Sequence, residues 1–144
     1  MLKGELEKRI DTIEESYEFM LAYAAQGLSG DDASPKGAQL REYLNRVDQA
    51  LIELTDLLRA RVQGNKLEPA ERYDAFLQVL ERDAKSSQAT IELVLAQPSI
   101  SSELVDNLNA SIHLRALLTD LFLIDEALKV AKKSSEPTSG PDEQ

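Results

Sequence analysis

The segment 114–128, LRALLTDLFLIDEAL, constrains the fold of this chain more than any other stretch. Its apolar residues recur at alternating steps of three and four, which places one face of an α-helix in an apolar environment. These residues are Leu114, Leu117, Leu121, Ile124 and Leu128. Leu118, Phe122 and Leu123 widen the face beyond a narrow coiled-coil seam. A helix this apolar must be covered on more than one side, by the other helices or by a second subunit.

The same periodicity predicts two earlier helices, over residues 2–26 and 35–63. Gly27 is a typical helix stop, and Ser34 before Pro35 is typical of a helix start. The apolar seam of the second helix stays in phase throughout. We therefore expect one uninterrupted helix from Pro35 to Gln63.

Two more helices are predicted over residues 69–97 and 101–132, separated by a break at Pro98. Four helices with short connections usually form an antiparallel up-down-up-down bundle. The sequence thus predicts an all-α protein with a single four-helix bundle domain over residues 1–133. Residues 134–144 contain no apolar side chain beyond proline, and we expect a disordered acidic tail there.

Composition narrows the function classes. The 144 residues include no cysteine, which excludes disulfides and thiolate metal sites. The formal net charge of −10 opposes binding to nucleic acid or anionic lipid, since both require neutralisation of phosphate by basic side chains. No stretch approaches the ~20 apolar residues that span a bilayer, and no signal peptide is visible. We expect a cytoplasmic protein that binds neither nucleic acid nor membrane.

The single histidine, His113, limits metal chemistry. Dinuclear sites in helical bundles need two Glu-x-x-His pairs, which this chain lacks. The sequence after His113 differs from the His-x-Leu-Lys-Gly pattern of phosphorelay domains, because the base arrives one position early, at Arg115. Asp106, Asn109 and Asp120 share the helical stripe of His113, which predicts a solvated polar face.

One pattern of carboxylates suggests catalysis. The segment 14–18, EESYE, resembles the Glu-Glu-x-x-Glu motif of the all-α MazG-like nucleoside triphosphate pyrophosphohydrolases. The segment 53–56, ELTD, is similar to that family's Glu-x-x-Asp motif on the next helix. The resemblance implies a Mg²⁺ ion that binds the triphosphate and activates water. The implied metal ligands are Glu14, Glu15, Glu18, Glu53 and Asp56.

Two surfaces could instead bind a protein. One is the excess apolar width of the last helix, where a symmetric homodimer would cover a possible oligomer interface formed by Leu118, Phe122 and Leu123. The other is the bundle end near the loop 27–37, where aromatic residues could anchor a partner or close the core. The predicted partner-binding residues at that end are Phe19, Tyr23, Leu28 and Tyr43.

The sequence therefore favours a non-catalytic interaction protein that binds another protein, as an adaptor, a chaperone-like protein or an assembly factor, without a cofactor. The alternative is a Mg²⁺-dependent, MazG-like pyrophosphohydrolase. The two differ in one geometric requirement, because a shared metal site needs the carboxylates of segments 14–18 and 53–56 to converge.

Overall fold

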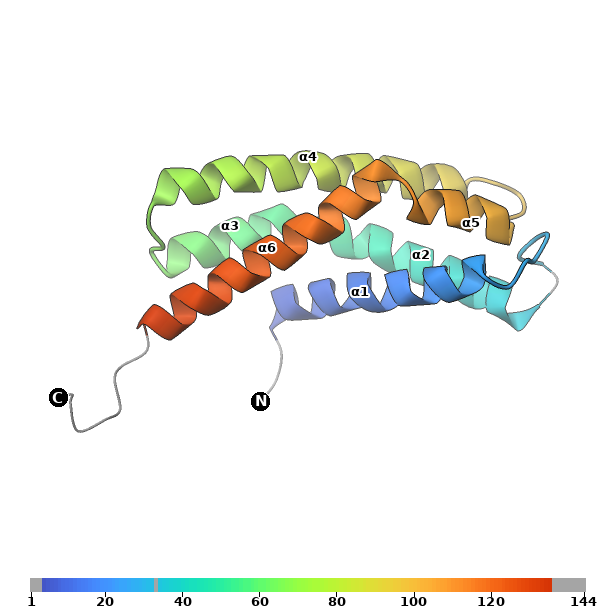
Figure 1. Cartoon of the computed structure of the whole chain (residues 1–144), viewed down its shortest axis with the longest axis horizontal. Helices are drawn as coiled ribbons and strands as arrows, with labels where there is room; N and C mark the ends of the chain where they lie inside the picture. Colours follow the sequence, from blue (N-terminus) through green and yellow to red (C-terminus); the bar gives the residue numbers. More distant parts are fainter. Residues whose placement is uncertain (1–3, 33, 136–144) are drawn as a thin grey trace, which may run out of the picture.

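The computed structural model describes residues 4–32 and 34–135, and this part of the chain is all-helical, as predicted. It contains six helices, so the predicted count of four is wrong (Figure 1). They are α1 (Glu5–Ala24), α2 (Pro35–Leu51), α3 (Leu54–Gly64), α4 (Ala70–Leu95), α5 (Ser102–Asn109) and α6 (Ile112–Ser135).

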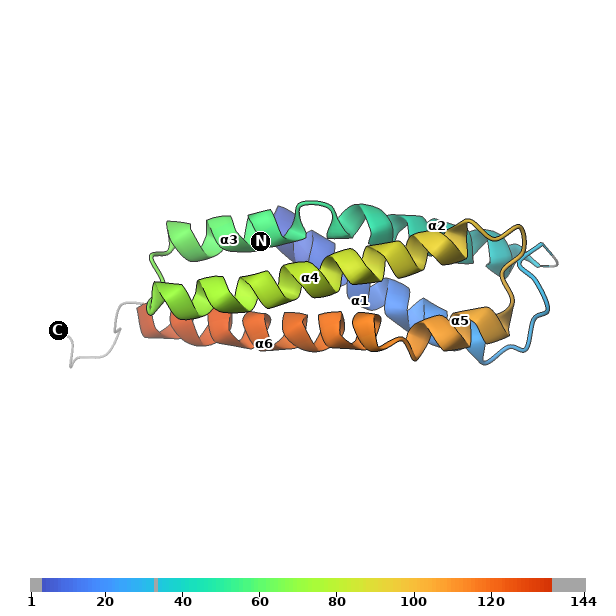
Figure 2. The ribbon, with the colours of Figure 1, turned by 90° about the horizontal axis from the view of Figure 1, so that it is seen from above.

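The six helices form a bundle-like arrangement because two pairs of them replace two predicted single helices. The helices α2 and α3 follow one another along one side of α4, and α6 lies along the other side (Figure 2). The helix α1 packs against α2 and α5, whereas α6 packs chiefly against α4. Figure 1 shows that α6 runs at an oblique angle to α1.

The predicted second helix is interrupted at Ile52 and Glu53. Ile52 is extended, and Glu53 takes a left-handed conformation with φ 63°. The carbonyl groups at the end of α2 lose their helical partners there. The Arg9 guanidinium of α1 replaces them, donating to the carbonyls of Gln49 (3.2 Å), Ala50 (3.4 Å) and Ile52. A side chain forty residues away thus stabilises the break.

The predicted fourth helix is interrupted at Ala110 and Ser111. Ser101 caps the shorter helix α5 by accepting a hydrogen bond from the Leu104 N–H at 3.0 Å. At the other end of α5, the buried Asn109 amide donates to the Met20 carbonyl of α1 at 3.1 Å. The break lets α5 pack on α1 while α6 turns to pack on α4.

The apolar face of segment 114–128 is confirmed as core. Leu114, Leu117, Leu121 and Ile124 are buried, and Leu128 packs against them. The buried residues of all six helices form one cluster, which is what a single domain of this length needs. The residues that widen this apolar face are less buried: Leu118 is partly buried, whereas Phe122 and Leu123 are exposed.

Two sequence predictions concern the C-terminal end and membranes. The helix α6 continues through Ser135, so the first two residues of the predicted tail are helical. Residues 136–144 of that tail lie outside the described residues.

Within residues 4–32 and 34–135, no helix is long and apolar enough to cross a membrane.

Candidate functional site

The structure brings the predicted aromatic residues together at one end of the bundle. The ring of Phe19 stacks on Tyr43 at 4.6 Å and on Tyr23 at 6.5 Å, measured between ring centroids. Tyr23 is 0% exposed, and its hydroxyl donates to the Ile100 carbonyl at 2.8 Å. Burial raises the pKa of Tyr23, and the nearby Asp31 carboxylate adds to the rise. Tyr23 therefore belongs to the core and has no surface to offer a partner.

Backbone contacts tie the following loop to the same end. The Ser102 hydroxyl donates to the Tyr23 carbonyl at 2.7 Å and accepts from the Leu28 N–H at 2.9 Å. The Ser102 N–H in turn donates to the Leu28 carbonyl at 2.8 Å. Only Phe19, Leu28 and Tyr43 of the predicted set remain partly accessible. This end therefore has a clear structural role, and its role in binding stays a prediction.

An arginine closes the adjoining helix end. Arg41 donates to the carbonyls of Leu95 (3.1 Å) and Gln97 (2.8 Å), where α4 ends. The same guanidinium forms an ion pair with Asp31, which also accepts from the Ile100 N–H at 2.6 Å. The hydrogen bond from Arg41 holds the pKa of Asp31 below its usual range. Arg41 and Asp31 therefore stabilise the end of α4 and the loop that follows it.

The two halves of the magnesium motif do not converge. Glu53 and Asp56 line a hollow of about 240 Å³ together with Glu81 and Lys85 of α4. Asp56 also lies 3.6 Å from the Arg59 guanidinium. Among the described residues, no group of three or more acidic or histidine side chains is arranged to hold a metal ion.

The carboxylates of segment 14–18 lie in another environment. Glu15 and Glu18 are exposed, and Glu14 is half-buried. Burial raises the pKa of Glu14, and the neighbouring carboxylates of Asp11 and Asp125 raise it further. Glu14 therefore lies close enough to Asp125 of α6 for their charges to interact, whereas Glu53 and Asp56 line a hollow beside α4. The geometric requirement of the pyrophosphohydrolase is therefore not met in this structure.

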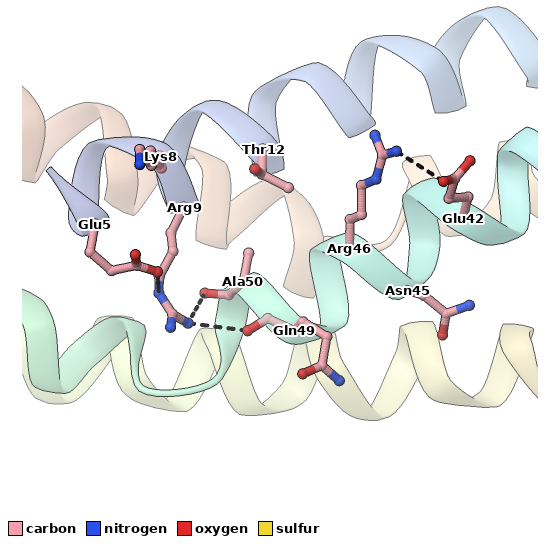
Figure 3. Close-up of a pocket in the computed structure, with 9 residues that line it drawn as sticks. All are labelled: Glu5, Lys8, Arg9, Thr12, Glu42, Asn45, Arg46, Gln49 and Ala50. Atoms are coloured by element: carbon pink, nitrogen blue, oxygen red, sulfur yellow. Dashed lines mark hydrogen bonds and ion pairs between the residues drawn. The ribbon is translucent and has the colours of Figure 1, made fainter. Parts of the chain in front are cut away.

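A polar hollow of about 540 Å³ lies between α1 and α2 (Figure 3). Four of the five charged side chains that line it form ion pairs within the protein: Arg9 pairs with Glu5 at 3.0 Å, and Arg46 pairs with Glu42 at 3.0 Å. Figure 3 also shows Arg9 directed at the backbone carbonyls that end α2. The hydrogen bonds of Arg9 in this hollow stabilise the break between α2 and α3.

The face formed by α4 and α6 is different. It carries six of the eight large hydrophobic side chains that are exposed among the described residues. They are Val79 and Leu93 of α4 and Ile112, Phe122, Leu123 and Val130 of α6. Of these, Phe122 is 62% exposed and Leu123 is 56% exposed. We refer to these six residues and the helix surfaces that carry them as the α4–α6 face.

A groove of about 280 Å³ lies between the two helices on this face. Apolar side chains dominate its lining, which consists of Arg72, Tyr73, Phe76, Leu123, Ile124 and Ala127. Arg72 is the one charged residue of that lining. An apolar groove with a charged rim is the usual form of a site that receives an apolar side chain or a helix.

Two carboxyl groups lie further along the same seam. Asp120 of α6 is only 7% exposed, and one of its oxygens has no hydrogen-bond partner among the described residues. Burial, and then the Asp83 carboxyl of α4 within hydrogen-bonding reach, raise the pKa of Asp120 to about 7. The predicted solvated stripe around His113 is thus wrong for Asn109 and Asp120, which are buried, although His113 itself is exposed.

Comparison with protein-family models, with curated proteins and with solved structures found no match. The sequence pattern predicted Phe122 and Leu123 as an exposed apolar surface but did not predict the other four residues of the α4–α6 face. A signal was present, because Leu123 and Val130 are seven residues apart and Val79 and Leu93 are fourteen apart, which repeats one side of a helix.

Proposed function

We propose that this protein is a non-catalytic helical interaction protein, acting as an adaptor, a chaperone-like protein or an assembly factor, which binds another protein through the α4–α6 face. The observation that carries the proposal is the concentration of six of the eight exposed large hydrophobic side chains on two adjacent helices. Scattered apolar residues are normal on a protein surface, whereas a concentration of them on two adjacent helices is typical of an interface, and Leu123 of this set also lines the groove.

The energetics support this surface over the aromatic end. Burying a leucine or phenylalanine side chain that was exposed stabilises a complex by about 1.5–3 kcal/mol. Leu123 and Phe122 still have most of that gain available, because more than half of each side chain is exposed. Tyr23 at the aromatic end has none, because it is already buried.

The predicted homodimer would place a second copy of this chain on this face. Light scattering during size-exclusion chromatography measures that directly. A monomer would direct the proposal to a different protein partner, and a dimer that dissociates when Leu123 is replaced would identify the partner as the chain itself.

The proposal is tested with two matched variants, Leu123→Asp on the α4–α6 face and Leu21→Asp on α1. Both leucines are exposed to a similar extent, so both variants should keep the helical circular dichroism and melting temperature of the wild type. In quantitative affinity capture, the proposal predicts that specific partners are lost with Leu123→Asp and retained with Leu21→Asp. Identical capture by the two variants would reject the α4–α6 face as the binding site.

A further inference from the structure

The helix α6 depends chiefly on one neighbour. It packs mainly against α4 and less against α5, and it runs at an oblique angle to α1 (Figure 1). A polar contact crosses from α6 to α4 between the carboxyl groups of Asp120 and Asp83. The ion pair of Lys129 with Asp125, by contrast, stays within α6 at 3.2 Å. The seam with α4 is therefore the main attachment of α6.

We infer that the Asp83–Asp120 pair is a pH-sensitive latch on α6. While the two carboxyl groups share a proton, α6 is held on α4. When both groups are ionised, α6 detaches from α4 more readily, by turning about the break at Ala110 and Ser111.

The pair lies in an otherwise apolar seam. Asp120 is 7% exposed, and Leu117, Leu121 and Ile124 on the same helix are buried. One oxygen of Asp120 has no hydrogen-bond partner among the described residues. One proton between two carboxyl groups makes a charge-assisted hydrogen bond, whereas two carboxylates in contact repel each other. Ionisation therefore changes the contact from attractive to repulsive.

The surroundings of the pair supply no buried counter-charge. Among the residues that the structure describes, the buried polar side chains include no lysine or arginine. The charged side chains beside the pair on α4 and α6, and those of α5 and α1, are exposed, paired or act on other groups. They are Glu81, which pairs with Lys85, exposed Arg82, Glu103, Asp106, His113 and Arg115, and Glu14, which acts on Asp125 and Lys129.

A metal ion is a poor alternative to the shared proton. Within residues 4–32 and 34–135, no group of three or more acidic or histidine side chains is arranged to hold a metal ion. Calcium and magnesium ions need about six or more oxygen ligands, which two carboxyl groups in an apolar seam do not provide. The proton is therefore the cation that fits between Asp83 and Asp120.

A second carboxyl contact on α4 lies in a different environment. Glu92 of α4 contacts Asp48 of α2, but Glu92 is exposed, so water solvates its charge and weakens the repulsion. The Gln88 amide of α4 also donates to the Asp48 carbonyl of α2 at 3.4 Å. The seam between α2 and α4 should therefore respond less to pH than the seam between α4 and α6.

The helix α5 is anchored on the other side of the break. The Asn109 amide at its end donates to the Met20 carbonyl of α1 at 3.1 Å. The Ser102 hydroxyl at its start donates to the Tyr23 carbonyl at 2.7 Å. The break at Ala110 and Ser111 follows directly after Asn109. Rotation about this break moves α6 and leaves α5 on α1.

Detachment of α6 exposes apolar surface that is otherwise buried. Leu117, Leu121 and Ile124 leave the core, and the groove loses one of the two walls that α4 and α6 supply. Exposure of three such side chains is costly, so the open form is rare at any pH. Ionisation of the pair raises the frequency of opening and does not produce a permanently open protein.

Hydrogen–deuterium exchange of the full chain, followed by mass spectrometry at pH 5 and pH 8, measures this opening. Each rate is divided by the intrinsic rate at the same pH to give a protection factor. If Asp120 regains its usual pKa in detached α6, the rise from 3.8 to about 7 corresponds to about a hundredfold change in the opening equilibrium between these pH values. Solvent access and proton sharing reduce this to about tenfold.

The latch predicts that the protection of segment 117–124 of α6 falls about tenfold from pH 5 to pH 8. At pH 8 this segment should be less protected than segment 13–20 of α1, because α6 opens without unfolding of the whole chain. Its exchange should also depend less on added urea, since detachment exposes only part of the surface that global unfolding exposes. Equal protection and equal urea dependence of the two segments would overturn the latch.

Three variants assign the effect to the pair. The pH dependence of segment 117–124 should nearly vanish in Asp120→Asn and be reduced in Asp83→Asn. It should stay as in the wild type in Asp106→Asn, which changes an exposed carboxylate of α5. A protection factor that does not change with pH in the wild type, or that changes as much in Asp120→Asn or Asp83→Asn as in the wild type, would overturn the latch.

Discussion

Replacing Asp120 with asparagine should stabilise the protein most at alkaline pH, and progressively less as the pH falls toward 3.8. In the wild type, the Asp120 carboxyl is buried against Asp83 in the seam between α4 and α6. An asparagine amide has the same shape, carries no charge and can donate to the Asp83 carboxylate. The substitution therefore removes an unfavourable charge without opening a cavity.

The direction in which the free energy of unfolding changes with pH follows from the number of protons that each state binds. The pKa of Asp120 rises from 3.8 to about 7 in the folded protein, so between these values the folded state binds more protons than the unfolded state. The free energy of unfolding contributed by this group is therefore highest below pH 3.8 and is lost as pH rises to about 7. Asp31 has a lowered pKa, so its contribution is lost only at lower pH, outside this window.

The magnitude comes from the same pKa. Because a tenfold change in an acid constant corresponds to about 1.36 kcal/mol, the rise from 3.8 to about 7 corresponds to about 4 kcal/mol at most. Solvent reaching the pair and proton sharing with Asp83 reduce this value. We expect Asp120→Asn to raise the free energy of unfolding by about 2 kcal/mol at pH 8 and by about 1 kcal/mol at pH 5, which already lies above the unfolded pKa of 3.8.

The assay is urea unfolding followed by circular dichroism at 222 nm, at several pH values from 5 to 8. Asp106→Asn is the control, because Asp106 is an exposed carboxylate on α5. The wild type should lose stability across this range, and Asp120→Asn should lose less. Glu14 and Glu92, whose pKa values are also raised, contribute in the same direction in both proteins, so the difference between the two proteins isolates Asp120. A variant that is less stable than the wild type at pH 8 would refute the reasoning.

Three further substitutions test the contacts that build the fold, each by urea unfolding. Arg41→Met should cost about 2 kcal/mol, because it removes charged hydrogen bonds at the end of α4 and leaves the Asp31 carboxylate unpaired; a loss below about 0.5 kcal/mol would contradict this role. Tyr23→Phe should cost about 1–2 kcal/mol through the lost bond to the Ile100 carbonyl, and an unchanged stability would show that this bond contributes nothing net. Glu53→Gly should stabilise the protein by about 0.5–1 kcal/mol, since its positive φ favours glycine, and a destabilised variant would argue against the break at this position.

The core was predictable from the sequence because apolar periodicity reports directly on which side of a helix is buried. The face from Leu114 to Ile124 is confirmed for this reason. The helix breaks were not predictable in the same way, because Leu51 and Leu54 remain buried on both sides of the first break and the pattern continues across it. The break depends on a long-range contact from Arg9, and local periodicity carries no information about it.

The candidate site was predictable only in part. Phe122 and Leu123 stood out because they exceed what one helical seam can bury. The groove that Leu123 lines requires the side-by-side packing of α4 and α6, which brings Phe76 of α4 to the same groove. The predicted solvated stripe of α6 was wrong for Asp120, which is buried. A stripe of polar residues shows only that their side chains lie on the same side of the helix. Whether that side faces water or a neighbouring helix is decided by the packing.

The measurement that tests the central claim most directly is photo-crosslinking in cells with p-benzoylphenylalanine placed at one of three positions. Position 123 lies on the α4–α6 face, position 43 at the aromatic end and position 21 on the outside of α1. The account predicts a discrete crosslinked protein from position 123 and none from position 21. A discrete product from position 43 with none from position 123 would contradict it and would locate the binding surface at the aromatic end.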